Sequence, residues 1–330
     1  MKKNTLPLLT AAFLLAACTT PLNAIPTVTP TSAPTITPAT TPTTIVLPSS
    51  SPAASYQFVT NKLIVPVTQA DAQHYALDLD GDGRPDNLFG QAFALLSSLA
   101  PGLDLQSTVN QGVDAGQIVM LHRLQTNDLV NSPNASWSIL PGLQTQSAPK
   151  FDGSDMFTLD ASVQSDSLIS GAVAGSHFTG GPGSAHIQMI VLGEPVQLNL
   201  IGVRIEADVN KNGCSNGRLG GGISVNDFQN SVLPAIAAGV NNMVAADKGC
   251  QAGCSNPAKV LLQVLDTDKN GTVTVDELKG NLLLNAAISP DLDLLDASGK
   301  FNPRQDGVKD ALSLGLGFSC VAAGFSAPAN

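Results

Sequence analysis

The chain has 330 residues, a formal net charge of −10 and only 13% charged residues. This balance argues against nucleic-acid binding and against a basic membrane-surface patch, because both depend on clustered Lys and Arg. Residues 56–330, which follow two N-terminal segments, are numerous enough to form one large domain or two small ones.

The first 17 residues have the pattern of an export signal. Lys2 and Lys3 form a basic start, and the apolar stretch 6–15 is too short to span a bilayer as an ordinary helix. The sequence Leu-Ala-Ala-Cys at 15–18 resembles the lipobox of bacterial lipoproteins. The resemblance implies that residues 1–17 are removed and that the sulfur of Cys18 carries a diacylglyceryl group. The alternative is an ordinary secretory signal with an incidental cysteine.

Residues 18–55 are rich in Thr, Pro and Ser. Prolines recur at every fourth position from Pro26 to Pro42, and the segment holds too little apolar surface to offset the entropy cost of ordering. We therefore expect a disordered tether behind Cys18. Signal and tether together predict an exported protein held by lipid on a bacterial membrane, at the cell surface or on the periplasmic face, with no transmembrane helix.

The segment 56–209 is predicted to be a β-rich domain. Two early runs, 56–67 and 73–79, alternate apolar and polar residues as strands do. Helical spacing follows over 88–96 and 105–113. Further strands, separated by Gly, Ser and Asp clusters, are expected over 116–125, 136–140, 156–165, 167–174, 186–192 and 196–209, the last two joined by a hairpin.

An acidic loop follows the run 73–79. Its pattern, D-x-D-x-D-G-x-x-D, resembles the nine-residue calcium loops of dockerin-like and integrin-propeller proteins. The resemblance implies four carboxylate ligands and one backbone carbonyl, from Asp78, Asp80, Asp82, Arg84 and Asp86. Phe89 stands at position 12, where an EF-hand has glutamate, so a further ligand would come from elsewhere or from water. The alternative is a solvated turn, in which four carboxylates would repel one another without a cation.

Residues 210–287 change to helical character. A Gly-rich turn is expected at 217–222, followed by a helix over 225–245 that Pro234 bends or breaks. Two more apolar runs at helical spacing, 257–265 and 278–284, flank a twelve-residue loop. We interpret 210–287 as a helical insertion.

The twelve-residue loop places oxygen-bearing side chains at alternating positions around Gly271 and ends in a glutamate. This pattern resembles the EF-hand over residues 255–285. The resemblance implies Ca²⁺ bound by Asp266, Asp268, Asn270, Thr272, Thr274 and Glu277. Val273 at position 8 is β-branched, as suits a short strand contact, although no second EF-hand loop lies at the usual distance. Residues 208–213 resemble the start of a calcium loop, but no acidic residue follows at the later ligand positions. We therefore interpret them as a turn.

The C-terminal segment 288–330 returns to β character. Strands are expected over 291–295 and 309–321, and the closing strand is expected to rejoin the first sheet. Besides Cys18 the chain has four cysteines: Cys214, Cys250, Cys254 and Cys320. In an exported chain this even count favours two disulfides with three connectivities open, and the alternative is a metal site.

The predicted fold class is α+β, mainly an antiparallel β-sandwich with a helical EF-hand-containing insertion. The sequence contains no H-E-x-x-H motif. His122 lies in an apolar run and fits a core histidine better than a ligand. Asp155 or Asp160 with Glu194 would be carboxylate pairs for glycoside chemistry, but the sequence does not set their separation.

Two functions are compatible with these patterns. The first is a non-catalytic, surface-anchored lipoprotein that binds or scaffolds extracellular or periplasmic material and is stabilised by structural Ca²⁺. The second is an exported, calcium-stabilised hydrolase of glycans or esters, whose catalytic residues would meet only in the fold. A calcium sensor, a third hypothesis, would require a large ligand-induced conformational change. The sequence favours the first function.

Overall fold

The computed structural model describes residues 53–100, 102–161, 167–246 and 257–327. The predicted signal peptide, the lipidation site Cys18, nearly all of the predicted tether, and Cys250 and Cys254 lie outside these residues. Within the described ranges, no helix is long and apolar enough to cross a membrane.

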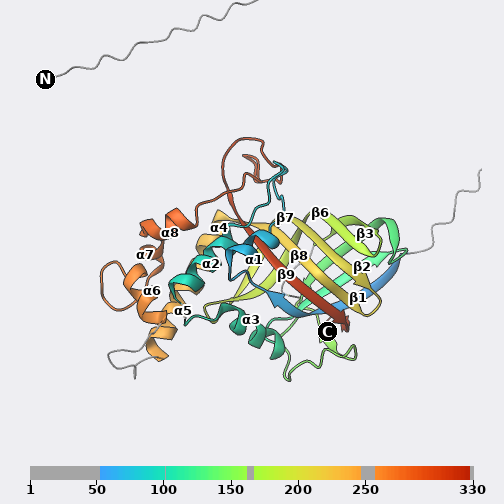
Figure 1. Ribbon diagram of the computed structural model, residues 1–330, viewed down its shortest axis with the longest axis horizontal. Helices are drawn as coiled ribbons and strands as arrows, with labels where there is room; N and C mark the ends of the chain where they lie inside the picture. Colours follow the sequence, from blue (N-terminus) through green and yellow to red (C-terminus); the bar gives the residue numbers. More distant parts are fainter. Residues whose placement is uncertain (1–52, 101, 162–166, 247–256, 328–330) are drawn as a thin grey trace, which may run out of the picture. The chain divides into compact units, whose positions relative to one another are not determined.

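Eight antiparallel strands form one closed barrel (Figure 1). Neighbours pair in the order β1-β2-β3-β5-β6-β7-β8-β9, and β9 returns to pair with β1. A separate parallel pair consists of β4 (Met156–Thr158) and β10 (Gly324–Ser326). The barrel strands are β1 (Ala54–Ile64), β2 (Met120–Thr126), β3 (Asn131–Pro141), β5 (Ile169–Ala174), β6 (His177–Val191), β7 (Glu194–Asn210), β8 (Gly213–Ser224) and β9 (Ala311–Ala322).

The predicted α+β class, with a mainly antiparallel sheet, is confirmed. The closing strand rejoins the first, as expected, with Phe58 opposite Ala322. The strands form one closed barrel and not the two packed sheets of a sandwich. Because β9 pairs with β1, the barrel has no unpaired strand edge. Strand alternation did not predict this closure, since inward and outward side chains alternate in sandwiches and barrels alike.

Large aromatic side chains fill the barrel. Trp137 of β3 contacts Phe58, Phe178 and Phe318, with ring centroids 6.5, 5.1 and 6.3 Å away. All four side chains are almost completely buried, and each burial contributes about 1.5–3 kcal/mol. An eight-stranded barrel is just wide enough for such side chains, so this interior is a packed core and not a channel.

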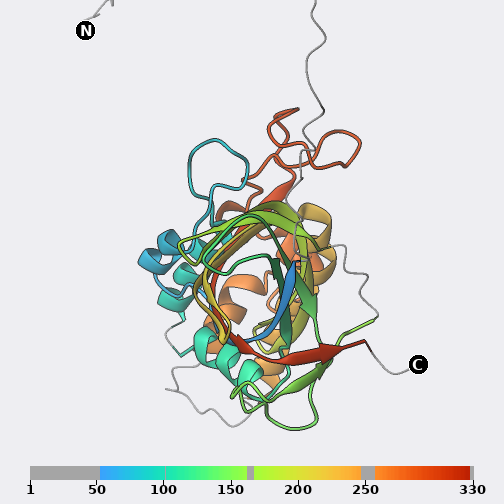
Figure 2. The ribbon, with the colours of Figure 1, turned by 90° about the vertical axis from the view of Figure 1, so that its right-hand side faces the viewer.

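Two groups of helices gather mainly at one end of the barrel, and Figure 2 shows helices behind the ring of strands. The first group, between β1 and β2 in the chain, consists of α1 (Gln69–His74), α2 (Leu88–Leu99) and α3 (Leu105–Asp114). The second group, between β8 and β9, consists of α4 (Val225–Asp227), the π-helical turn η1 (Phe228–Val232), α5 (Leu233–Ala246), α6 (Pro257–Leu265), α7 (Val275–Gly280) and α8 (Leu282–Ala287).

The helix predicted over 225–245 contains one π-helical turn just before Pro234 and then continues as α5. The N–H of Leu233 donates to the carbonyl of Phe228, five residues back, which makes 228–232 a π turn. Farther along α5, the helix backbone lies directly against the β6–β7 hairpin. A Cβ at Gly239 would come within 2.6 Å of Leu192 Cβ, so glycine permits this close approach.

Several predicted elements differ from the structure. The run 73–79 is the end of α1 followed by an isolated bridge between Leu77 and Asp86, because Thr68 caps a helix by accepting a hydrogen bond from Asp71 N–H. The strand expected over 156–165 is only β4 within the described residues. The strand expected over 291–295 is reduced to isolated bridges at Leu292 and Leu295.

The largest difference concerns β8. The expected Gly-rich turn at 217–222 is a barrel strand, so the helical insertion begins at Val225 and not at residue 210. The glycines lie where the wall is crowded. A Cβ at Gly222 would come within 2.4 Å of Leu294 Cδ1, and one at Gly217 within 2.5 Å of the Phe318 ring. Glycine here marks close packing and not a turn.

A disulfide joins two neighbouring barrel strands. Cys214 of β8 lies directly opposite Cys320 of β9, and the bond links residues 106 positions apart in the sequence. Cys214–Cys320 is therefore one of the cysteine pairings that the sequence left open. In the chain-entropy account, closing a loop of about this length stabilises the fold by roughly 4–5 kcal/mol.

Candidate metal sites

The loop from Asp266 to Glu277 joins α6 to α7. Asp266 follows the last residue of α6 directly and is 7% exposed. Gly271 has φ +90°, a backbone conformation that residues with side chains disfavour, although an added Cβ would meet no atom within 4 Å. The glycine at position 6 therefore makes the sharp turn that the sequence predicted.

Three carboxylates converge inside this loop. One oxygen from each of Asp266, Asp268 and Glu277 lies within 4.8 Å of the others. Backbone N–H groups hold the first of these: Asp266 accepts hydrogen bonds from Asn270 N at 3.2 Å and from Gly271 N at 2.8 Å. Such a cluster could hold a metal ion, and its donors are the hard oxygens that Ca²⁺ takes.

The predicted ligands Asn270, Thr272 and Thr274 also lie in this loop, each with a local partner. Asn270 accepts hydrogen bonds at Oδ1 from the Thr272 N–H and hydroxyl, and its amide donates to Asp268 at 2.8 Å. Thr274 is the N-cap of α7 and forms a capping box with Glu277. The position-9 threonine thus begins the helix that carries the position-12 glutamate.

Glu277 is the most highly bonded carboxylate of the loop. Its Oε2 accepts from the Thr274 N–H and hydroxyl, each at 2.9 Å. Its Oε1 accepts from Thr267 N, Thr267 Oγ1 and Asp268 N at 2.8, 3.1 and 3.2 Å. These hydrogen bonds, that from Thr274 N–H first, lower the pKa of Glu277 to about 2. The side chain is therefore fully charged at neutral pH and spans both ends of the loop.

Asn241 of α5 clamps the loop from outside, a contact that sequence reasoning missed. Its Nδ2 donates to the Val273 carbonyl and its Oδ1 accepts from the Val273 N–H, both at 2.8 Å. Val273 is position 8, the residue whose β-branched side chain suggested a strand contact, and it is 2% exposed. A side-chain amide has the same donor and acceptor as a peptide group. Asn241 therefore replaces the strand partner that an unpaired loop lacks.

The first acidic loop is only partly assembled. Oxygens of Asp78, Asp80 and Asp86 lie within 4.8 Å of one another, whereas Asp82 is not in this group and accepts from Arg84 N at 2.7 Å. Phe89, at position 12, is buried against Phe93 and Phe228 and offers no ligand. Three of the predicted ligands therefore converge.

The electrostatics of this loop favour a positive charge. Burial, and to a lesser extent the nearby carboxylates of Asp80, Asp291 and Asp82, raise the pKa of Asp86 to about 6, although a hydrogen bond from Leu79 N–H opposes the rise. Asp291 belongs to a distant segment that sequence reasoning did not place here. The same segment brings Lys309 Nζ to 3.9 Å from Asp80, so a protein cation already balances part of the charge.

A scan against protein-family models, a search of curated proteins and a search of solved structures found no match to this chain.

The candidate carboxylates for glycoside chemistry have other partners. Asp155 accepts hydrogen bonds from the backbone N–H groups of Lys150 and Phe151, and Glu194 accepts from the Asn242 amide at 2.6 Å. These contacts hold a turn and attach α5 to the start of β7. The described hydrogen bonds therefore give Asp155 and Glu194 structural roles.

His122 and His177 also have side-chain hydrogen-bond partners. His122 is fully buried in the barrel, as predicted, and burial lowers its pKa to about 3. Trp137 Nε1–H donates to its Nδ1, so the proton lies on Nε2 and donates to Thr60 Oγ1 at 2.7 Å. His177 pairs at 2.7 Å with Asp208, at the predicted turn, and hydrogen bonds from Asn216 and then His177 lower the pKa of Asp208.

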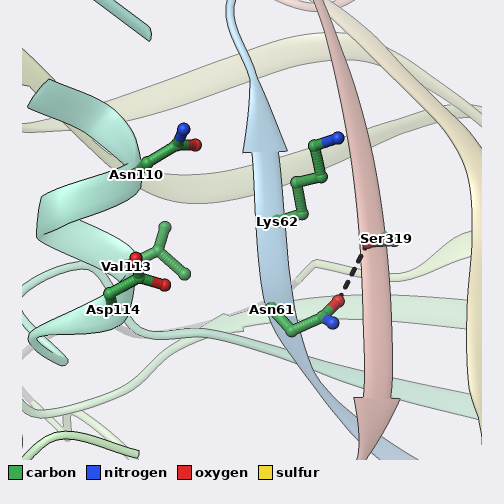
Figure 3. Close-up of a pocket in the computed structure, with 6 residues that line it drawn as sticks. All are labelled: Asn61, Lys62, Asn110, Val113, Asp114 and Ser319. Carbon is green, nitrogen blue, oxygen red and sulfur yellow. Dashed lines mark hydrogen bonds between the residues drawn. The ribbon is translucent and has the colours of Figure 1, made fainter. Parts of the chain in front are cut away.

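A polar hollow of about 300 Å³ lies between α3 and strands β1 and β9 (Figure 3). The side chains of Asn110 and Asp114 extend from α3, and Lys62 and Asn61 extend from β1. Ser319 donates to Asn61 Oδ1 at 2.9 Å across the two strands. The hollow contains one carboxylate, Asp114, and one ammonium group, Lys62, so its charge does not favour a calcium ion.

Proposed function

We propose that this chain is an exported, lipid-anchored, non-catalytic binding or scaffolding protein that Ca²⁺ stabilises at the loop 266–277. The observation that carries the calcium proposal is the convergence of three carboxylates, from Asp266, Asp268 and Glu277, within 4.8 Å. Gly271 turns this loop and Asn241 holds it from outside. The contact between Asn241 and Val273 thus helps to order the loop without using an oxygen of the converging carboxylates.

Calcium suits this loop better than other common metals. The converging donors are oxygens, whereas Zn²⁺ and copper prefer nitrogen and sulfur ligands. Mg²⁺ demands near-ideal octahedral geometry and keeps several waters, while Ca²⁺ accepts six to eight oxygens in a flexible arrangement. The loop 78–86 is a second, weaker calcium candidate, because Lys309 already faces Asp80.

The role of the ion is structural in this proposal. Ca²⁺ would tie the end of α6 to the start of α7, which carries Glu277. Occupancy a hundredfold above Kd adds about 2.7 kcal/mol to the stability of the folded state. That contribution is a sizeable part of a typical total of about 5–15 kcal/mol.

The calcium proposal is tested by thermal melting of the protein with Ca²⁺ and with a chelator. We expect Ca²⁺ to raise the melting temperature, Mg²⁺ at the same concentration to raise it less, and Glu277→Gln to lose most of the Ca²⁺ effect. Asp276→Asn is the matched control, since Asp276 is the neighbouring acidic residue in the first turn of α7 but is not in the converging cluster. Identical melting curves with and without Ca²⁺ would exclude the site.

Lipid anchoring rests on the lipobox ending at Cys18 and on the proline-rich segment that precedes β1. The protein should fractionate with membranes when expressed in a bacterium, and Cys18→Ala should release it. Retention of that variant on membranes would contradict anchoring through Cys18.

A further inference from the structure

An apolar pocket of about 470 Å³ lies between one end of the barrel and the helices that cover it. We call it the end pocket. Strands β6 to β9 form its floor, and α2, α3, α5, α6 and α8 form its walls. Its lining includes Phe93, Leu96, Met189, Leu198, Leu261 and Leu284.

Every residue that lines the end pocket is Ala, Val, Leu, Ile, Met or Phe. Small-molecule sites usually add a few polar groups that fix the orientation of a polar or ring-shaped ligand. Here no lining side chain can pair with a buried hydroxyl, amide or carboxylate, and burying such a group unpaired is costly. The part of a ligand that enters must therefore be hydrocarbon.

The size of the end pocket points to a ligand and not to a packing defect. Native interiors contain few voids larger than a water molecule. An engineered apolar cavity of about 150 Å³ already stays dry and binds benzene. At roughly 30 Å³ per methylene, about the liquid volume of a water molecule, 470 Å³ holds an unbranched chain on the order of fifteen carbons.

The end pocket opens to solvent beside α2, α6 and α8. Leu95, Val264 and Leu283 line it and yet are 44%, 40% and 68% exposed. Leu282, next to them on α8, is 83% exposed. A polar head group can remain in water at this mouth while its chain lies inside.

We propose that the end pocket binds the single acyl chain of a long-chain fatty acid, with the carboxylate at the mouth. The inference rests on the proposed function in that it names a ligand class for a binding protein. It does not depend on calcium, because none of the carboxylates at 78–86 or 266–277 lines the pocket. If calcium binding were disproved, the fatty-acid proposal would be unaffected. If fatty-acid binding were disproved, the calcium proposal would be unaffected.

The test uses the full chain with Cys18→Ala, so that no covalently attached lipid competes. Fluorescent cis-parinaric acid should bind saturably at one site and be displaced by hexadecanoate. Butyrate should displace it poorly, because a short chain buries few methylenes. No saturable binding, or displacement by cholesterol or phospholipid vesicles but not by hexadecanoate, would overturn the proposal.

Two pocket-filling variants locate the site. Ala92→Phe on α2 and Ala287→Phe on α8 place a ring in the end pocket from different walls. Each should weaken hexadecanoate binding by about tenfold or more, because the ring occupies space that the chain needs. Ala286→Phe is the matched control, since Ala286 is the exposed neighbour on α8. Binding that is equal in all three variants, with melting temperatures showing them folded, would place the ligand elsewhere and refute the assignment.

Discussion

At the scale of single residues, environment decides the role of each ionisable group. Glu277 and His122 show the two extremes. Hydrogen bonds from the loop backbone hold Glu277 charged, whereas complete burial keeps His122 neutral. The apolar run around His122 correctly predicted a core histidine, whereas the predicted role of Glu277 as a Ca²⁺ ligand stays a prediction.

His122 makes stability depend on pH in a defined direction. Its pKa is about 3 in the folded state and about 6.5 in an unfolded chain. Below pH 6.5 the unfolded chain therefore binds a proton at His122 that the folded protein does not bind. The stabilisation that depends on neutral His122 is fully present above pH 6.5 and is lost as the pH falls toward 3. Since one unit of pKa is worth about 1.4 kcal/mol, the loss at pH 4 is on the order of 3 kcal/mol.

His122→Gln tests this account. Gln can accept from Trp137 and donate to Thr60 but does not titrate. Denaturant unfolding of metal-free protein should show lower stability at pH 7, by about 1–3 kcal/mol, but a smaller further loss between pH 7 and pH 4. His74→Gln, at an exposed position, should keep the wild-type pH dependence. An acid loss in His122→Gln as large as in the wild type would contradict the role given to His122.

At the scale of elements, α5 links the barrel to the loop 266–277. Its Gly239 lies against Leu192 of the β6–β7 hairpin, and its Asn241 holds Val273 of the loop. Helical spacing predicted the helix, but the partner of Val273 comes from 32 residues away. Local pattern carries no information about such a contact, because it depends on how the helices pack.

Asn241→Ala should make the loop 266–277 less ordered without removing any of its proposed metal ligands. The buried N–H and carbonyl of Val273 would lose their partners, at a cost of about 1–3 kcal/mol. A less ordered loop also pays more ordering entropy when it binds an ion. We expect a lower melting temperature in chelator and a larger calcium Kd, measured by titration.

Asn242→Ala is the control for this prediction. Asn242 is the next residue on α5 and bonds Glu194 at the surface, away from Val273. Its removal should leave the calcium Kd close to the wild-type value. Equal calcium affinity in the Asn241 and Asn242 variants would show that the clamp on Val273 has no part in binding.

At the scale of the whole molecule, the sequence predicted the elements better than their assembly. Most strands and helices lie where periodicity placed them, and the twelve-residue loop has the turn at Gly271 and the convergent carboxylates that its pattern implied. Barrel closure depends on pairing between β1 and β9, at opposite ends of the described chain. The Gly-rich segment of β8 was misassigned because close packing and turns both select glycine.

The assembly also explains why the loop 78–86 is the weaker calcium candidate. The loop 266–277 has a partner that orders its backbone, namely Asn241. The loop 78–86 faces the segment 291–310, which brings Asp291 and also Lys309. Sequence reasoning treated each acidic loop in isolation, whereas the fold supplies the charges that distinguish them.

The most direct test of the central claim is calorimetric titration of Ca²⁺ into the metal-free full chain, with Glu277→Gln and Asp276→Asn in parallel. We predict a saturable site in the wild type and in Asp276→Asn that disappears in Glu277→Gln, with any weaker site at 78–86 unchanged among the three proteins. No saturable heat in the wild type, or an unaltered isotherm in Glu277→Gln, would contradict calcium binding at the loop 266–277.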